Sequence, residues 1–308
     1  MDINTFIEDR FRHFNAGELA RCATSLNSFI DSGGSMMISL AGAMSTAQIG
    51  RSLAPAIRAG KIHAISCTGA NLEEDLFLLI GGENYHQIPD WRNLSPQDEK
   101  LLHDSGMNRV TDTCIPEEST IQVLIPELLK VWSEERRFPH QHLFELLDRI
   151  SLKNDSKNSW LVAAKEHDIP IYVPGWEDST LGNIFAAFCI KGVLEHTQVK
   201  LGVEAMIHLA DWYSEKSEPI GFLQVGGGIA GDFPICVVPL LNQDLQKSVR
   251  KWAWYAQISD STTSYGGYSG AYPNEKISWG KLEIDTPKFM IESDATIVLP
   301  LLLESLNQ

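Results

Sequence analysis

The sequence predicts an α/β protein built on a Rossmann-like parallel sheet flanked by helices. Short apolar segments alternate with helical segments along most of the chain, which is typical of parallel sheets. Several of the apolar segments are followed directly by glycines or small polar residues, the composition of turns at the carboxyl ends of such strands. Because no low-complexity linker interrupts the 308 residues, we expect a single domain over residues 1–308.

The first strand and its neighbouring helices follow from local patterns. Residues 1–32 carry apolar side chains at helical spacing, which predicts one or two N-terminal helices, and Gly33-Gly34 ends them. Residues 36–40 (MMISL) then predict a buried strand. The small residues of 41–46 predict a turn, and residues 47–59 a helix.

The same unit then repeats. A second strand is expected over 62–66, a second turn over 67–71 and a helix over 72–80. Two consecutive strand-turn-helix units indicate a parallel sheet. Residues 85–109 are polar and are expected to be irregular, and 117–150 are expected to form helices. Three more strands are expected, over 169–173, 220–225 and 289–292.

Composition limits the partners and the compartment. The chain has 40 acidic and 25 basic residues and a net charge of −15, with no basic run, so a nucleic-acid partner is not expected and cationic substrates are favoured. The charged N-terminus does not resemble a signal peptide, and no apolar run reaches membrane-spanning length. We therefore expect a cytoplasmic protein with no membrane contact.

Cysteine and histidine usage gives no sign of a metal site. The five cysteines form no CxxC pair, so reduced thiols are expected. His140 and His142 have no neighbouring residues at metal-ligand spacing, and neither an HExxH nor a GxSxG motif occurs. The expectation is a chemistry without a metal.

Glycines and carboxylates follow the predicted strands. Gly226-Gly227-Gly228 come directly after an apolar strand, which is compatible with a tight turn or with a cradle for a phosphate. Glu73-Glu74-Asp75 follow another strand and open a helix, where carboxylates either cap the helix or hold a ribose diol or an ammonium group. Asp178 and Asp294 occupy equivalent positions after strands.

The segment 269–281 (SGAYPNEKISWGK) is the most informative of the chain. Its Lys281 lies two residues after Trp279, with a glycine between them. Periodicity alone predicts a surface lysine. If packing desolvates the amine, however, Lys281 becomes a candidate nucleophile, because only a neutral amine attacks an imine or carbonyl carbon.

These residues resemble the deoxyhypusine synthase family, and more closely its bacterial deoxyhypusine synthase-like branch. Segment 269–281 is similar to the family's SGAxPxEAVSWGK motif. Other similar segments, in order along the chain, are 68–75 (TGANLEED), 106–109 (GMNR), 167–171 (HDIPI), 178–182 (DSTLG), 226–228 (GGG) and 294–300 (DATIVLP).

The resemblance implies a single domain of the deoxyhypusine synthase type and an NAD-dependent transfer of a 4-aminobutyl group from spermidine through a lysine imine. Lys281 would be the nucleophile, with Trp279 and Glu275 as its catalytic partners. Residues implied to hold NAD are Ser45, Thr46, Thr68, Gly69, Glu74, Asp178, Gly227, Asp294 and Ala295. Positions implied to face the amine substrate are Glu73, Asn183, Asp232 and Tyr268.

Three departures from the family pattern affect that amine pocket. Asn183 and Tyr268 stand where the family has acidic residues, and Ile229 to Phe233 replace a Lys-His-His cluster, although Asp232 restores a negative charge. We therefore expect a small-molecule acceptor such as putrescine, which would give homospermidine. A protein lysine as acceptor, and a non-catalytic NAD- or polyamine-binding relative, remain alternatives. The resemblance also implies a homotetramer with sites completed between subunits.

Overall fold

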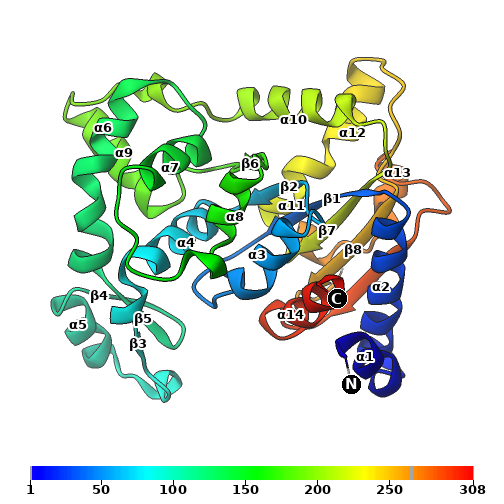
Figure 1. Ribbon diagram of the computed structural model, residues 1–308, viewed down its shortest axis with the longest axis horizontal. Coiled ribbons are helices and arrows are strands. Elements are labelled where there is room, and N and C mark those ends of the chain that lie inside the picture. The colour runs from blue at the N-terminus through cyan, green and yellow to red at the C-terminus, as the bar shows by residue number, and fades with distance from the viewer. Residues whose placement is uncertain (1, 264–265, 308) are drawn as a thin grey trace.

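The computed structural model describes residues 2–263 and 266–307. Within them, six parallel strands form one sheet in the order β6-β2-β1-β7-β8-β9 (Figure 1). This confirms the predicted Rossmann-like parallel sheet flanked by helices. The strands are β1 (Ser35–Leu40), β2 (Ala64–Cys67), β6 (Ile171–Tyr172), β7 (Ile220–Val225), β8 (Trp254–Ser259) and β9 (Lys288–Glu292).

The central strands are buried along their whole length because helices cover both faces of the sheet. Side chains alternate between two core clusters: Met36 and Ile38 belong to one, and Met37 to the other. One face packs against α2 (Phe14–Asp31), α3 (Gly50–Arg58), α8 (Trp160–Glu166) and α14 (Ala295–Leu306), and the other against α10 (Val203–Glu215), α11 (Gly228–Ile235) and α12 (Val237–Pro239).

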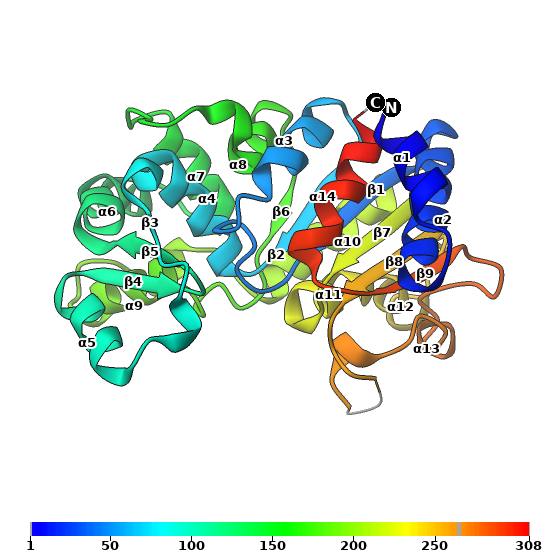
Figure 2. The same ribbon diagram turned by 90° about the horizontal axis from the view of Figure 1, so that it is seen from below.

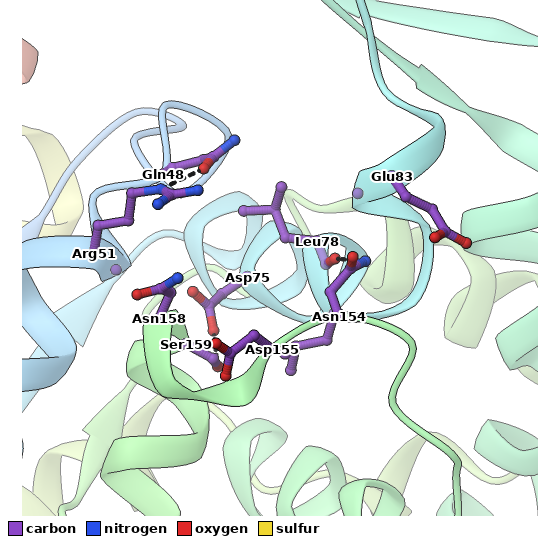
Figure 3. Close-up of a pocket in the computed structure, with 12 residues that line it drawn as sticks. Gln48, Arg51, Asp75, Leu78, Glu83, Asn154, Asp155, Asn158 and Ser159 are labelled. Atoms are coloured by element: carbon purple, nitrogen blue, oxygen red, sulfur yellow. Dashed lines mark hydrogen bonds between the residues drawn. The ribbon is translucent and has the colours of Figure 1, made fainter.

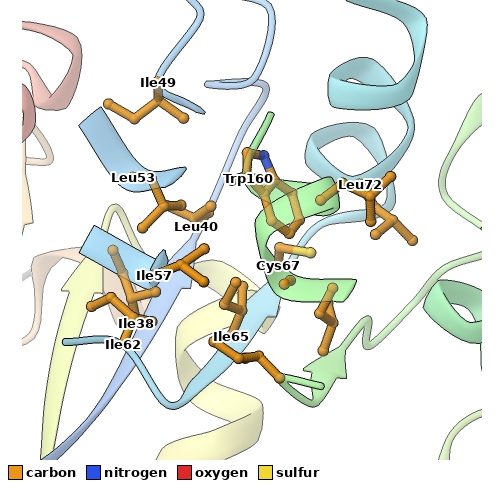
Figure 4. Packing of buried hydrophobic residues seen from close by; sticks show 14 of the residues in the cluster. Ile38, Leu40, Ile49, Leu53, Ile57, Ile62, Ile65, Cys67, Leu72 and Trp160 are labelled. Atoms are coloured by element: carbon orange, nitrogen blue, oxygen red, sulfur yellow. The ribbon is translucent and has the colours of Figure 1, made fainter. Parts of the chain in front are cut away.

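Figure 4 shows how the first of these clusters packs. Leu40 of β1 and Ile65 of β2 lie close to Leu53 and Ile57 of α3, and Trp160 of α8 is packed on the same side. Burial of these aliphatic side chains removes the apolar face of α3 from water and so attaches the helix to the sheet. The strand-turn-helix unit predicted over 36–59 is thereby confirmed, with the turn extending to Ile49.

The chain ends lie side by side (Figure 2). Helix α1 (Ile3–Arg10) packs against α14, and Nδ2 of Asn4 donates a hydrogen bond of 3.2 Å to the carbonyl oxygen of Ser305. The predicted N-terminal helices are thus present as α1 and α2.

A second, smaller unit lies beside the main sheet. Three antiparallel strands, in the order β3-β5-β4, and α5 (Pro96–Asp104) occupy most of residues 86–116. The prediction of an irregular segment over 85–109 was wrong, because these strands are short and β3 is exposed, so they lack the apolar alternation that marks a strand. The strands are β3 (His86–Gln87), β4 (Met107–Val110) and β5 (Thr113–Pro116).

The remaining helices extend the first core cluster towards this smaller unit. They are α4 (Gly69–Gly81), α6 (Ile125–Glu134), α7 (Pro139–Leu147) and α9 (Thr180–Ile190). Trp132 of α6 packs edge-on against Phe185 of α9, with 5.4 Å between ring centroids. A last short helix, α13 (Glu275–Ser278), lies in the segment 269–281. No helix in the described part of the chain is both long and apolar enough to cross a membrane.

Candidate active site

The residues expected to hold NAD lie in segments that follow the strands, along the carboxyl edge of the parallel sheet. In the strand register, Leu40 lies beside Cys67 and Val225, and Ser259 lies beside Glu292. The segments that follow these strands are therefore neighbours. They contain the turn Ala41–Thr46, the start of α4, the glycines 226–228 and the start of α14.

The strand order reverses between β1 and β7, since β2 lies on one side of β1 and β7 on the other. Ligands of open α/β sheets bind in the crevice at such a point. Gly226, after β7, allows close approach to Ala41, after β1, because a Cβ at position 226 would lie 2.7 Å from the Cβ of Ala41. Helix α11 then begins at Gly228, with Gly227 at its N-cap and no side-chain cap, so the amides of its first turn remain available to an anion.

The turn Ala41–Thr46 is held against α4 by a set of buried hydrogen bonds. The hydroxyl of Ser45 donates to the carbonyl oxygen of Asn71 at 2.7 Å and accepts from Nε1 of Trp160 at 2.9 Å. The hydroxyl of Thr68 donates to the carbonyl oxygen of Gly42 at 2.7 Å and also caps α4. Both side chains therefore shape the turn that borders the crevice.

Glu74 lies between this turn and α4. Its Oε2 accepts a hydrogen bond of 3.2 Å from the amide of Thr46, and the residue is 6% exposed. Burial raises the pKa of the Glu74 carboxyl to about 7. Gly69, five residues earlier, lets α4 approach the loop that precedes α9, because a Cβ at position 69 would lie 2.5 Å from the Cβ of Ser179.

Glu73 is a helix cap, one of the two roles expected for the carboxylates of residues 73–75. Its two carboxylate oxygens accept from the amides of Thr180 at 2.8 Å and Leu181 at 2.7 Å, so it caps α9 rather than its own helix. Burial raises the pKa of Glu73. Asp75, the third carboxylate of the run, accepts from Ser159 and lines a different pocket, of about 260 Å³, together with Arg51 and Asn158 (Figure 3).

The other predicted residues near this edge are more exposed. Asp178 lies in the turn before α9, and Asn183 lies on α9, where its Nδ2 donates to the carbonyl oxygen of Ser179 at 2.7 Å. Asp294 is the N-cap of α14 and accepts from the amide of Thr296 at 2.7 Å, with Ala295 as the first helical residue.

A cavity of about 800 Å³ brings together five predicted residues from three segments of the chain. They are Asp232, Tyr268, Glu275, Trp279 and Lys281. Glu73 and Asn183, predicted to face the same amine, do not line this cavity within the single chain.

Lys281 is almost enclosed in the cavity. Only 7% of the residue is exposed, against 67% of Trp279, and its Nζ lies 3.4 Å from Oδ1 of Asp232. The same ammonium lies 5.9 Å from the ring centroid of Trp279 and 5.8 Å from that of Tyr268. The surface position that periodicity suggests for Lys281 is therefore wrong, because aromatic rings and α11 cover it.

Buried glutamines beneath the cavity were missed by the sequence analysis. The hydroxyl of Tyr268 donates to Oε1 of Gln224 at 2.7 Å, and Nε2 of Gln257 donates to the carbonyl oxygen of Ser269 at 2.7 Å. Gln224 and Gln257 are fully buried in β7 and β8. A glutamine inside a fully apolar strand is the signal that would have found them, because buried amides need partners.

Two further lining residues, Lys276 and Cys236, were also missed. Strand β8 was missed with them, because its sequence WYAQIS (254–259) has no turn signal directly before it. No group of three or more His, Cys, Asp or Glu side chains suited to a metal occurs among residues 2–263 and 266–307.

The residue types along the carboxyl edge of the sheet are compatible with a dinucleotide. Gly42 and Gly228 have positive φ values of 63° and 56°, and a Cβ at either would enter open space, so the backbone is open to a phosphate. Carboxylates of the kind that accept from ribose hydroxyls follow β2 (Glu74), β6 (Asp178) and β9 (Asp294), so they are spread along this edge of the sheet. This donor set agrees with the NAD expected from the resemblance.

A family model described as deoxyhypusine synthase matches residues 9–306. The chain is 29% identical over 312 residues to a deoxyhypusine synthase-like protein of the cyanobacterium Cyanothece sp., covering 96% of this chain and 76% of the relative. It is 27% identical over 299 residues to "Probable deoxyhypusine synthase 2" of Methanosarcina acetivorans, covering 96% of this chain and 83% of the relative.

A solved structure assigned as a deoxyhypusine synthase, from Entamoeba histolytica, has a similar fold. Its TM-score is 0.60 at 12% sequence identity, and the match covers 99% of this chain and 92% of that chain. At this identity the likeness shows the fold.

Proposed function

The chain belongs to the deoxyhypusine synthase family, and we propose that it is an NAD-dependent 4-aminobutyl transferase that acts on polyamines through an imine on Lys281. NAD-dependent aminobutyl transfer is the reaction of this family. The observation that carries the proposal is the enclosure of Lys281 in a cavity with Asp232, Trp279 and Tyr268. Such a cavity holds an amine nucleophile away from bulk water and offers aromatic faces to a cationic substrate.

Bound NAD would take a hydride from the carbon beside the secondary amine of spermidine and return it to the product. The neutral Nζ of Lys281 bonds to that carbon as the carbon–nitrogen bond to 1,3-diaminopropane breaks, so the aminobutyl group is held as an imine. An acceptor amine then bonds to the same carbon and the bond to Lys281 breaks, which restores the lysine. Asp232, 3.4 Å from Nζ, is placed to hold the proton that Lys281 gives up.

Residues along the carboxyl edge of the sheet would hold the cofactor, and two of their contacts support that role. Thr46 and Glu74 are joined at the turn after β1, and Gly227 precedes the uncapped start of α11. Helix α11 also carries Asp232, so one helix runs from the cofactor crevice to the reacting lysine. The full proposed set is Ser45, Thr46, Thr68, Gly69, Glu74, Asp178, Gly227, Asp294 and Ala295.

A small amine acceptor such as putrescine is part of the proposal. Tyr268 fills the side of the cavity over Lys281 with an aromatic ring instead of a carboxylate, which supports a pocket altered for another acceptor. We also propose a homotetramer in which a second subunit completes the site. The support is that Trp279 is 67% exposed and that Glu73 and Asn183 lie outside the lysine cavity of their own chain.

The test is chromatographic identification of amines after incubation with NAD, spermidine and putrescine. Homospermidine and diaminopropane are expected from the intact protein, and neither from Lys281→Ala, which should still bind NAD. Lys247→Ala, a change at an exposed lysine, is the control and should keep full turnover. Full turnover by Lys281→Ala would refute the assignment of Lys281 as the nucleophile. Diaminopropane without homospermidine would point to another acceptor, including a protein lysine, and no product from any donor would favour a non-catalytic binding protein.

A further inference from the structure

A second lysine is buried in the cavity that holds Lys281. Lys276 is the second residue of α13. It lines the same cavity and is 2% exposed. Its Nζ donates to the carbonyl oxygen of Ala271 at 2.9 Å and lies 4.9 Å from the ring centroid of Tyr268 and 5.6 Å from that of Tyr255. Both lysine ammonium groups therefore border the ring of Tyr268.

The ammonium of Lys276 has donors left over. A lysine ammonium carries three N–H donors, and the hydrogen bond to Ala271 uses one of them. Within the described residues no carboxylate comes within 4 Å of this Nζ, whereas Lys281 has Asp232. Burial lowers the pKa of Lys276 to about 8, so the group is still mainly charged at neutral pH. The two tyrosine rings stabilise that charge in part.

Two carboxylates that line the cavity differ in their surroundings, and the ammonium of Lys276 is a buried cation. Asp232 is engaged with Lys281, and Glu275 is exposed next to Lys276 at the start of α13. An exposed carboxylate such as Glu275 suits the ammonium of a ligand. The buried cation of Lys276 suits an anionic oxygen, and it opposes a second ammonium at the same place.

We infer that, among small amine acceptors, the cavity prefers one that carries a carboxylate, which Lys276 binds, so that putrescine is accepted less well than an amino carboxylate of the same length. The role of this ligand as an acceptor rests on the proposed function, whereas its binding to Lys276 does not depend on turnover. A charge-assisted hydrogen bond in a desolvated cavity corresponds to a preference of about tenfold to a hundredfold.

Ornithine and putrescine form the matched pair for the test, because they differ by one carboxylate. The two amines compete as acceptors with spermidine as donor, and the ratio of their aminobutyl products is measured by chromatography with mass detection. We expect the intact protein to favour ornithine at least tenfold. Lys276→Met, which keeps the apolar stem, should lose that preference, and Lys276→Arg, which keeps the charge, should retain most of it.

Two outcomes overturn the inference: putrescine used at least as well as ornithine by the intact protein, or an ornithine preference that survives Lys276→Met. If Lys276→Met does not fold, Lys276→Gln takes its place, since the amide can still donate to Ala271. If no donor releases diaminopropane, the proposed transfer has failed, and calorimetric binding of ornithine and putrescine to the same variants decides the role of Lys276. Failure of the intact protein to bind ornithine more tightly than putrescine would then also overturn it.

Discussion

Lys281 and Asp232, 49 residues apart in the chain, meet inside one cavity with 3.4 Å between Nζ and Oδ1. Lys281 is almost fully buried, whereas about half of the Asp232 side chain is exposed. The carboxylate therefore lies between the enclosed amine and the open part of the cavity. At this pair, α11 meets the segment 269–281.

Replacing Asp232 by Asn should lower kcat/KM for aminobutyl transfer at least tenfold. The amide keeps the size of the side chain but cannot accept the proton of Lys281 or pair with an ammonium. The measurement is steady-state release of diaminopropane. Asp244→Asn, at an exposed acid on the same cavity, is the matched control and should change kcat/KM less than threefold. Equal effects of the two variants would remove Asp232 from the proposed chemistry.

Replacing Glu73 by Gln should destabilise the fold by about 2 kcal/mol, because one of the two amides at the start of α9 loses its carboxylate acceptor. Urea unfolding at pH 8 measures the change in the free energy of unfolding. The exposed neighbour Glu177→Gln should leave that free energy within about 0.5 kcal/mol of its original value. An unchanged stability of Glu73→Gln would show that the cap contributes nothing.

The burial of Glu74 predicts a pH dependence of stability. Its pKa is about 7 in the folded protein against 4.5 for an ordinary glutamate side chain, so the folded state holds the proton more tightly than the unfolded state. This contribution is fully present below pH 4.5 and is lost as the pH rises through 7, with an upper bound of about 3 kcal/mol. Glu74→Gln should therefore be more stable than the original protein at pH 8, with a smaller difference at pH 5.

Unfolding midpoints at the two pH values test this prediction, with the exposed Glu118→Gln as the control. A fall in stability of Glu74→Gln at pH 8 would contradict it. The same substitution also addresses the cofactor: if Glu74 accepts from a ribose, NAD affinity should rise between pH 6 and pH 8 in the original protein and stay flat in Glu74→Gln.

Replacing Gly227 by Ala should impair both stability and transfer. A Cβ at this position would lie 2.0 Å from Oγ and 2.5 Å from Cα of Ser269, so the backbone before Gly270 must move. We expect a loss of about 2 kcal/mol and at least a tenfold fall in turnover. The control, Gly60→Ala, has a φ of 67° with no atom within 4 Å of the new Cβ, so strain alone should cost about 1 kcal/mol and leave turnover unchanged.

Sequence reasoning was accurate where a feature is local. Strand β7 was predicted with its observed bounds, Ile220–Val225, because its apolar run ends at three glycines. Strand β8 was missed although it lies inside the sheet between β7 and β9. Its sequence, with Trp254 at the start and Gln257 in the interior, carries no periodic signal, and its burial depends on neighbours that are distant in sequence.

The strand-turn-helix units, the glycines at the carboxyl edge and the motif that contains Lys281 can be identified in the sequence, because each depends on residues a few positions apart. The contacts that these parts make follow from the packing of the folded chain. Glu73 caps a helix that begins more than 100 residues later, and Lys276 enters the cavity of Lys281 under the rings of Tyr255 and Tyr268. Burial and pairing of a charge depend on the side chains that surround it in space, and no local spacing specifies them.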